Sequence, residues 1–267
     1  MAKAKVTTET LRLMKQKGER IAALTAYDYL WATLLDEAGV DVLLVGDSVG
    51  TVVQGHDTTV PVTLENILYH TEMVTRGTKR ALVIADMPFM SFQVSPQDAL
   101  RNAGQLLKLS NAEAVKLEGG TVVVDTVRHL TAAGIPVMGH LGLTPQSIHK
   151  FGSYKVRGDE ESEAQQIFDD AKALEQAGVF ALVLEKIPGT LAARVTAALE
   201  IPTIGIGAGP ECDGQILVTQ DMIGLFTRFQ PRFVRRYLAM AETLRGAFGE
   251  FVKDVKDREF PNASESY

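Results

Sequence analysis

Three acidic residues stand at the ends of short apolar runs in this chain. Asp47 follows VDVLLVG, Asp86 follows ALVIA, and Glu118 follows AEAVKL. The carboxyl ends of buried parallel strands meet at one rim, so the three carboxylates are expected to lie together. Like charges repel there unless a cation lies between them, and oxygen ligands suit Mg²⁺ better than zinc. The pattern therefore predicts a Mg²⁺ site of Asp47, Asp86 and Glu118; the alternative is that each acid caps a helix or pairs with a surface lysine.

Lys116 precedes Glu118 by two residues, so a strand would place both side chains on one face, with Val115 and Leu117 packed outward. A lysine that faces the interior of a barrel is costly unless it meets an anion. Lys116 is therefore a candidate for binding the carboxylate or keto oxygen of a substrate. The alternatives are a Schiff-base lysine and a buried structural ion pair with Glu118.

Three further polar residues lie at the ends of apolar runs. Glu185 closes FALVLE and is not needed for the metal site, which makes it a candidate general base that removes a proton next to a carbonyl group. His140, in GHLG, would orient a substrate or transfer a proton, unless it is a hydrogen-bonded core histidine. Ser48 would donate a hydrogen bond to a substrate carboxylate or cap the segment that follows it.

The strands and helices that position these residues can be predicted from the alternation of apolar runs and amphipathic stretches. Runs of this length, bounded by turn residues, are typical of strands buried on both faces. The alternation predicts an α/β fold, a single (β/α)8 TIM barrel with an extra N-terminal helix, rather than a doubly wound open sheet. The expected strands cover residues 20–26, 40–48, 81–89, 112–120, 135–142, 180–188, 201–209 and 215–218, and the expected helices cover 8–18, 27–38, 64–77, 95–109, 121–133, 159–177 and 189–199.

The chain shows no break in composition that would divide it. We therefore predict one barrel domain over residues 1–256, followed by a polar tail over residues 257–267. Residues 143–159, LTPQSIHKFGSYKVRGD, form a long polar stretch inside the alternating pattern. A stretch of that length in a compact domain predicts a lid or binding loop, with a disordered insertion as the alternative.

Composition narrows the class of protein. The 267 residues carry a net charge of −6 and no basic block, which argues against a nucleic-acid partner. No apolar stretch approaches the ~18 residues of a membrane span, and the start has no secretory signal, so a cytoplasmic protein without membrane contact is expected. Cys212 is the only cysteine, which excludes a disulfide framework and favours a structural role for it.

Six motifs follow one another in this chain: GDSVGTVVQGHDTTVPVTLENILYHTEMV, ADMPFMSF, AVKLEGG, IPVMGHLGLTPQS, ALVLEKIP and PTIGIGAGPECDGQILVTQDMIG. In that order they resemble the ketopantoate hydroxymethyltransferase (3-methyl-2-oxobutanoate hydroxymethyltransferase) family, over about residues 8–251. The resemblance implies a (β/α)8 barrel of the phosphoenolpyruvate/isocitrate-lyase type. It also implies a cytoplasmic homo-oligomer, often a homodecamer, and the first committed step of pantothenate and coenzyme A biosynthesis.

The resemblance also assigns roles to matching residues. Asp47, Asp86 and Glu118 match the Mg²⁺-site acids of the family. Its keto-acid-binding positions match Asp47, Ser48, Asp86 and Lys116, and its proton acceptor matches Glu185. The implied reaction transfers a hydroxymethyl group from 5,10-methylenetetrahydrofolate to 3-methyl-2-oxobutanoate. A Mg²⁺-stabilised enolate is the expected intermediate, and 2-dehydropantoate and tetrahydrofolate are the products.

Two rival functions remain open at this point. A Mg²⁺-dependent 2-oxo-acid lyase or mutase on the same barrel would share the metal site, although such lyases often carry a cysteine in the lid and residues 143–159 have none. A non-catalytic barrel scaffold would tolerate loss of the acids. The folate co-substrate follows from the resemblance alone, because no folate-binding motif is readable in the sequence.

Overall fold

The computed structural model describes residues 4–267 and contains two compact units. The first unit spans Met1–Leu217 and the second spans Val218–Tyr267. The prediction of one domain over residues 1–256 with a tail from residue 257 stays a prediction.

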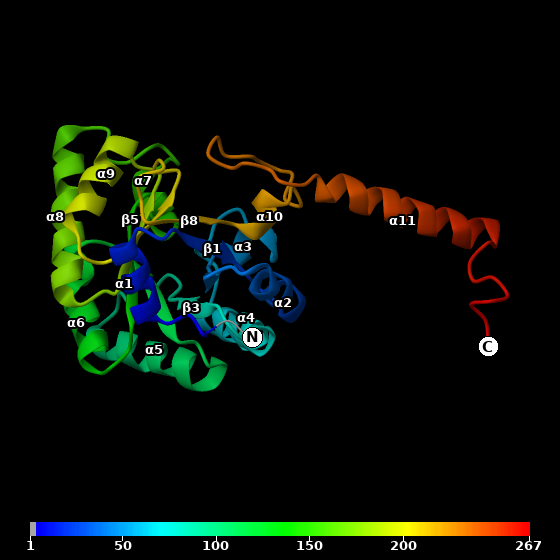
Figure 1. Cartoon of the computed structure of the whole chain (residues 1–267), viewed down its shortest axis with the longest axis horizontal. Coiled ribbons are helices and arrows are strands. Elements are labelled where there is room, and N and C mark those ends of the chain that lie inside the picture. Colours follow the sequence, from blue (N-terminus) through cyan, green and yellow to red (C-terminus); the bar gives the residue numbers. More distant parts are fainter. Residues whose placement is uncertain (1–3) are drawn as a thin grey trace. The chain divides into compact units, whose positions relative to one another are not determined.

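Eight parallel strands form a closed barrel in the first unit (Figure 1). Each strand pairs with the next along the chain, and β1 closes the ring by pairing with β8. This confirms the predicted barrel and shows that the doubly wound open sheet was the wrong alternative. The strands are β1 Ile21–Thr25, β2 Val42–Val45, β3 Leu82–Asp86, β4 Ala114–Glu118, β5 Val137–Gly142, β6 Ala181–Glu185, β7 Thr203–Ile206 and β8 Gly214–Leu217.

The predicted helices are found with small shifts at their ends. Local sequence explains these boundaries: Ser95 caps the helix that begins with Pro96, and its side chain accepts a hydrogen bond from the backbone N–H of Asp98. The helices and 3₁₀ turns of this unit are α1 Thr8–Lys17, α2 Tyr29–Ala38, α3 Val49–Val52, α4 Leu64–Gly77, α5 Pro96–Ser110, η1 Thr121–Val123, α6 Val124–Ala132, η2 Pro145–Ser147, α7 Ile148–Phe151, α8 Glu161–Ala177 and α9 Gly189–Ala198. The turns η2 and α7 lie in the stretch 143–159, for which no helix was expected.

Alternation along the strands separates an inner from an outer core. Val115 and Leu117 of β4 belong to the outer cluster, together with helix residues such as Leu106 and Val127, as predicted. Lys116 and Glu118 occupy the alternate positions, which continue the inward row that Ala114 begins. The inward apolar residues of the strands are Ile21, Ala23, Val42, Leu44, Leu82, Ile84, Ala114, Met138, Ala181, Val183, Ile204 and Ile216.

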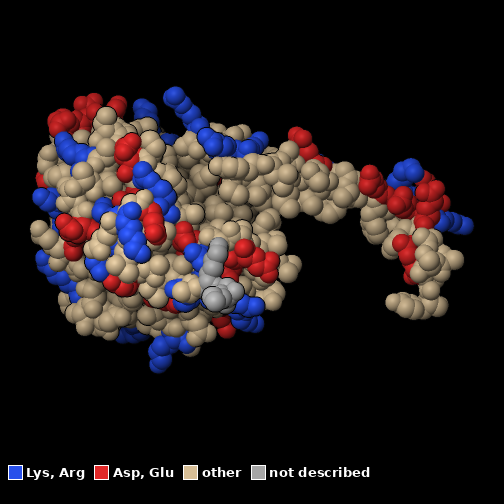
Figure 2. All heavy atoms as spheres, in the orientation of Figure 1, with Lys and Arg blue, Asp and Glu red and all other residues tan. Residues whose placement is uncertain are grey.

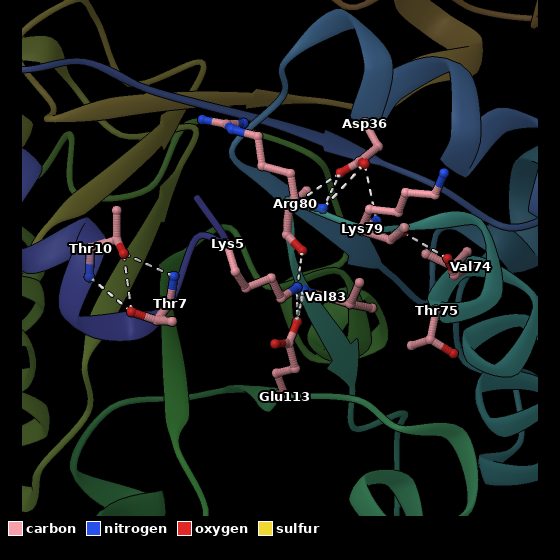
Figure 3. Close-up of polar contacts among 12 residues, drawn as sticks. Lys5, Thr7, Thr10, Asp36, Val74, Thr75, Lys79, Arg80, Val83 and Glu113 are labelled. Carbon is pink, nitrogen blue, oxygen red and sulfur yellow. Dashed lines mark hydrogen bonds and ion pairs between the residues drawn. The ribbon is translucent and has the colours of Figure 1, made fainter. Parts of the chain in front are cut away.

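The amino-terminal end of the barrel is covered by the segment that contains α1. Val6 and Leu11 join the inner core and are almost fully buried. Lys5 fixes this segment, because its Nζ lies 2.6 Å from both Glu113 Oε2 and the Ala81 carbonyl oxygen (Figure 3). The Glu113 carboxylate also accepts a hydrogen bond from the backbone N–H of Val83. With this end closed, the carboxyl ends of the strands are left to form a site.

The second unit contains two helices, α10 Thr219–Met222 and α11 Met240–Asp257. No helix was predicted over α11. It presents apolar side chains to solvent, including Phe248, Phe251 and Val252. The final residues, 258–267, lie beyond this helix and include none of the helices or strands.

Charged side chains of both signs are interspersed on the visible face of the first unit (Figure 2). Within residues 4–267, no helix is both long enough and apolar enough to cross a membrane.

Candidate active site

The carboxyl ends of four neighbouring strands supply the polar side chains. Asp86, Glu118 and Glu185 are the last residues of β3, β4 and β6, and His140 lies on β5 between them. The strand register makes these residues neighbours: Asp86 on β3 lies beside Lys116 on β4, and Glu118 on β4 lies beside His140 on β5. The structure therefore brings together at one rim the residues that the sequence predicted there.

Lys116 links two of the acids. Its Nζ donates a hydrogen bond of 2.8 Å to Asp86 Oδ1 and lies 3.9 Å from Glu118 Oε1, and all three side chains are buried. Burial lowers the pKa of Lys116, but the charges of Asp86, Glu118 and Asp47 outweigh this effect and raise it, so the ammonium form persists. A permanently charged Lys116 fits an anion-binding role and disfavours a Schiff base, which needs a neutral amine.

His140 lies between two carboxylates. Its Nδ1 is 3.4 Å from Glu118 Oε1 and its Nε2 is 3.4 Å from Glu185 Oε2. Neither nitrogen has a partner that meets hydrogen-bond geometry in residues 4–267, so charge attraction dominates. Burial and Lys116 lower the pKa of His140, but Glu118 and Glu185 outweigh them and raise it to about 9. The imidazolium is therefore the favoured form near neutral pH, and His140 joins Glu118 to Glu185.

Asp47 is the acid with the least compensation. Its backbone N–H donates to Asp86 Oδ2 at 3.1 Å, which places it beside the other acids. Burial raises the pKa of Asp47 well above its usual range, and the charges of Asp86 and Glu118 raise it further. Within residues 4–267, the ion pairs of this cluster of four carboxylates involve two cationic side chains, Lys116 and His140. The excess negative charge must be relieved by a proton or by a cation.

The carboxylate oxygens of this cluster suit a small divalent cation. The structure does not, however, place Asp47, Asp86 and Glu118 so that all three could ligate one ion directly. No group of three or more His, Cys, Asp or Glu side chains within residues 4–267 is placed so that it could hold a metal ion. Lys116 and backbone N–H groups occupy oxygens of Asp86 and Glu118. Mg²⁺ commonly takes one or two carboxylates and completes its shell with water, which suits Asp47, the least compensated acid, beside Asp86. Ligation by Asp47, Asp86 and Glu118 together stays a prediction.

Two residues that contact the cluster carried no role in the sequence analysis. The Gln146 side chain donates to Asp47 Oδ2 at 3.0 Å, and the Tyr27 hydroxyl lies 2.7 Å from Ser48 Oγ. Tyr27 is almost fully buried, so Ser48 is held beside Asp47 by a phenol rather than by solvent. In the sequence, the one feature that could have indicated Gln146 is its position shortly after the GHLG motif. A single glutamine belongs to no recognisable motif of functional residues, so it was not predicted.

The stretch 143–159 is attached at both ends to the end of β6. The backbone N–H of Leu143 donates to the Glu185 carbonyl at 2.8 Å, and that of Arg157 donates to the Lys186 carbonyl at 2.9 Å. Lys186 Nζ also donates to the Tyr154 carbonyl oxygen. Burial raises the pKa of the Tyr154 hydroxyl, and the Glu185 charge raises it further, so this side chain lies near the candidate base. The stretch is thus tied to the backbone of Glu185.

Comparison with known proteins identifies the relatives of this chain. The sequence model of one family, ketopantoate hydroxymethyltransferase, matches residues 5–263. The chain belongs to this family. Relatives named 3-methyl-2-oxobutanoate hydroxymethyltransferase include one from Prosthecochloris aestuarii, 59% identical over 98% of this chain and 96% of its own length. Another, from Salinibacter ruber, is 57% identical over 98% of this chain and 99% of its own length. The chain is therefore a transferase enzyme, as predicted.

Solved structures share the barrel fold of this chain. Phosphonopyruvate hydrolase in complex with oxalate and Mg²⁺ covers 97% of this chain and 93% of its own, with a TM-score of 0.62 at 14% identity. The 2,3-dimethylmalate lyase, a member of the PEP mutase/isocitrate lyase superfamily, covers 96% of this chain and 89% of its own, with a TM-score of 0.59 at 18% identity. Likeness at such low identity concerns the fold alone.

Proposed function

We propose that this member of the ketopantoate hydroxymethyltransferase family transfers a hydroxymethyl group from 5,10-methylenetetrahydrofolate to 3-methyl-2-oxobutanoate. The products are 2-dehydropantoate and tetrahydrofolate, in the route to pantothenate and coenzyme A. The observation that carries the proposal is the position of Glu185, a half-buried carboxylate beside His140 at the rim that also holds Asp47, Asp86, Glu118 and Lys116. Names of relatives at 57% and 59% identity support the keto-acid substrate.

Some residues of the site bind the substrate, and others take part in proton transfer. Lys116 supplies a fixed positive charge for the carboxylate or keto oxygen of the substrate, and Ser48 Oγ offers it a hydrogen bond. Glu185 accepts the C3 proton of 3-methyl-2-oxobutanoate. The resulting enolate carbon forms a bond to the methylene carbon of the folate as one bond from that carbon to a folate nitrogen breaks. Water then supplies the hydroxyl group as the second carbon–nitrogen bond breaks, and the two nitrogens of the released tetrahydrofolate take up the C3 proton and one proton from water. His140 holds the Glu185 carboxylate in place through its opposite charge.

A divalent cation fits into this scheme at Asp47 and the neighbouring Asp86. Asp47 and Asp86 would hold Mg²⁺, with Glu118 acting directly or through water. When bound, the ion supplies Lewis-acid stabilisation of negative charge on the keto oxygen. The stretch 143–159 excludes water from the rim while the carbanionic species exists.

Proton exchange at C3 tests the proposal directly. Proton NMR of 3-methyl-2-oxobutanoate in D₂O with protein and Mg²⁺ should show loss of the C3 proton signal, and 2-dehydropantoate should form only after methylenetetrahydrofolate is added. Glu185→Gln should abolish exchange. Glu161→Gln, which changes an exposed carboxylate 3.7 Å from Arg194, is the matched control and should exchange normally. A wild-type protein that neither exchanges nor transfers would refute the proposal, and exchange without transfer would favour a 2-oxo-acid lyase or mutase.

The proposal includes self-association, with a homodecamer as the expected form, and a place in the cytoplasm. Sedimentation velocity of the purified chain tests the assembly, since a decamer of the 29.0 kDa chain is readily distinguished from a monomer or dimer.

A further inference from the structure

Gln146 enters the acid cluster from outside the barrel strands. It is the second residue of η2, at the start of the stretch 143–159, and only 4% of it is exposed. Its Nε2 donates hydrogen bonds of 3.0 Å to Asp47 Oδ2 and to the Met87 carbonyl oxygen. Its backbone N–H donates to Glu118 Oε2 at 3.1 Å. One residue thus holds one oxygen of each of two acids, Asp47 just after β2 and Glu118 at the end of β4.

Gln93 stabilises the orientation of the Gln146 amide that Asp47 and the Met87 carbonyl select. Gln93 Nε2 lies 3.3 Å from Gln146 Oε1 and donates to it. Because the two acceptors, Asp47 and the Met87 carbonyl, require the nitrogen on their side, the oxygen must face Gln93. Gln93 is exposed and has no contact with Asp47, Asp86 or Glu118 among its hydrogen bonds in residues 4–267. It can therefore orient Gln146 without taking part in the cluster.

A neutral donor has a specific advantage at this position. A cationic side chain would cancel the excess negative charge that the cluster offers to a divalent ion, and a carboxylate would repel Asp47. The amide fixes Asp47 and Glu118 by hydrogen bonds and leaves their charge intact. Asp47 in turn donates its backbone N–H to Asp86, so the positions of all three acids depend on the same small network.

We infer that Gln146 is a positioning residue: its side-chain amide and backbone N–H fix the positions of Asp47 and Glu118 for binding of Mg²⁺ and the keto acid, and Gln93 stabilises the orientation of that amide. This inference rests on the proposed function. It also makes the start of the stretch 143–159 part of the site, since the residue that orients the acids belongs to that stretch. In this role Gln146 acts through Asp47 and Glu118 and does not contact the substrate.

Gln146→Met tests the role, since it keeps the size of the side chain and removes its donors. The control is Gln165→Met, which breaks a glutamine–aspartate hydrogen bond of 2.9 Å on the exposed face of α8. The affinity for Mg²⁺ is measured by calorimetric titration of the metal-free protein, and kcat and KM are measured for C3 proton exchange. Gln146→Met should weaken Mg²⁺ binding about tenfold and lower kcat about 10- to 100-fold, the range expected for hydrogen bonds to charged groups.

A second variant keeps the test decisive if Gln146→Met folds poorly. Gln93→Met alters only the orienting residue, which is exposed, so melting temperature should not change. We expect a three- to tenfold loss of kcat and a weaker Mg²⁺ affinity. If Gln93→Met retains wild-type kcat and Mg²⁺ affinity within twofold, the orienting role of Gln93 is wrong. If a folded Gln146→Met also retains wild-type kcat and Mg²⁺ affinity within twofold, the whole inference is overturned. The same conclusion follows if Gln146→Met is unfolded and Gln93→Met has wild-type kcat and Mg²⁺ affinity.

Failure of the inference differs from failure of the proposed function. If the wild-type protein does not exchange the C3 proton at all, the proposed function fails, and Mg²⁺ titration alone then decides whether Gln146 orders the acids. If wild type exchanges and Gln146→Met matches Gln165→Met in both measurements, the function stands and the positioning role is rejected.

Discussion

Lys116 Nζ and Asp86 Oδ1 form an ion pair of 2.8 Å that is almost completely excluded from water, with side-chain exposures of 5% and 1%. The two residues are direct partners across neighbouring parallel strands, so both face the barrel interior at its carboxyl end. Removing two charges from water is costly, and the pair persists because Asp86, Glu118 and Asp47 all attract the ammonium. The barrel therefore maintains this lysine at an energetic cost, as expected for a binding residue.

Lys116→Met should destabilise the protein by about 3–5 kcal/mol, because it leaves Asp86 buried without its partner. It should also abolish binding of 3-methyl-2-oxobutanoate. Added Mg²⁺ should raise the melting temperature of the variant more than that of wild type, since a cation replaces part of the lost charge. Differential scanning calorimetry with and without Mg²⁺ measures the stability and the effect of the ion, and calorimetric titration measures the affinity for 3-methyl-2-oxobutanoate.

The control for this variant is Lys15→Met at the opposite end of the barrel. Lys15 Nζ lies 2.9 Å from Asp213 Oδ2, and their side-chain exposures are 15% and 16%. Its loss should reduce stability while leaving keto-acid affinity unchanged. Equal loss of keto-acid binding in both variants would show that Lys116 acts only through stability.

Gly142→Ala should disturb the candidate base through the backbone. Gly142 has a φ of +93°, and a Cβ there would collide with the carbonyl oxygen of Glu185 and lie 2.7 Å from Ile187 Cγ2. The left-handed backbone and the collision together predict a loss of about 2–5 kcal/mol in the free energy of unfolding. Because Glu185 must move to make room, C3 proton exchange should also fall at least tenfold. Urea unfolding and NMR exchange measure the two effects.

Gly152→Ala is the matched control within the stretch 143–159. Gly152 also has a positive φ, +66°, but nothing lies within 4 Å of an added Cβ. Only the backbone penalty of about 1 kcal/mol should appear, with exchange unchanged. If both variants lose exchange equally, flexibility of the stretch matters more than the contact with Glu185.

Periodicity in the sequence was sufficient to predict the barrel and the direction of most site residues. Strict alternation on β4 required Lys116 and Glu118 to share a face, and the structure has Val115 and Leu117 in the outer core. The grouping of acids at the rim followed from a general property of parallel strands, that their carboxyl ends meet. These predictions succeeded because a strand's period is fixed by backbone geometry and is independent of distant partners.

Contacts from outside the strands could not be predicted in this way. Gln146 reaches Asp47 across 99 residues of sequence, and Tyr27 reaches Ser48 across 21. Such contacts depend on how loops fold over the rim, which leaves no periodic trace. The turns η2 and α7 were missed for a related reason: each is too short to show a helical repeat.

Asp221, on α10 in the second unit, gives a pH-dependent contribution to stability. Burial raises its pKa from 3.8 to about 6, and the Arg236 charge opposes this only in part. Below the pKa of Asp221 in the unfolded chain, both the folded and the unfolded state hold the proton, and the carboxyl group does not reduce the free energy of unfolding. As pH rises from about 4 to 6, the unfolded chain ionises first, so stability falls, and above pH 6 the full penalty is present.

Asp221→Asn should therefore stabilise the second unit above pH 6 and have little effect near pH 4. The side chain is partly exposed, so we expect a gain of only about 1 kcal/mol at pH 8. Hydrogen exchange followed by mass spectrometry, with variant and wild type compared at the same pH, should show greater protection of residues 218–226 in the variant at pH 8 only. The control is Asp257→Asn, which removes an exposed carboxylate 3.5 Å from Lys253 in the same unit and should change protection little at either pH. An Asp221→Asn variant that gains no protection at pH 8, or gains as much at pH 4, would show that the ionised carboxylate does not destabilise this unit.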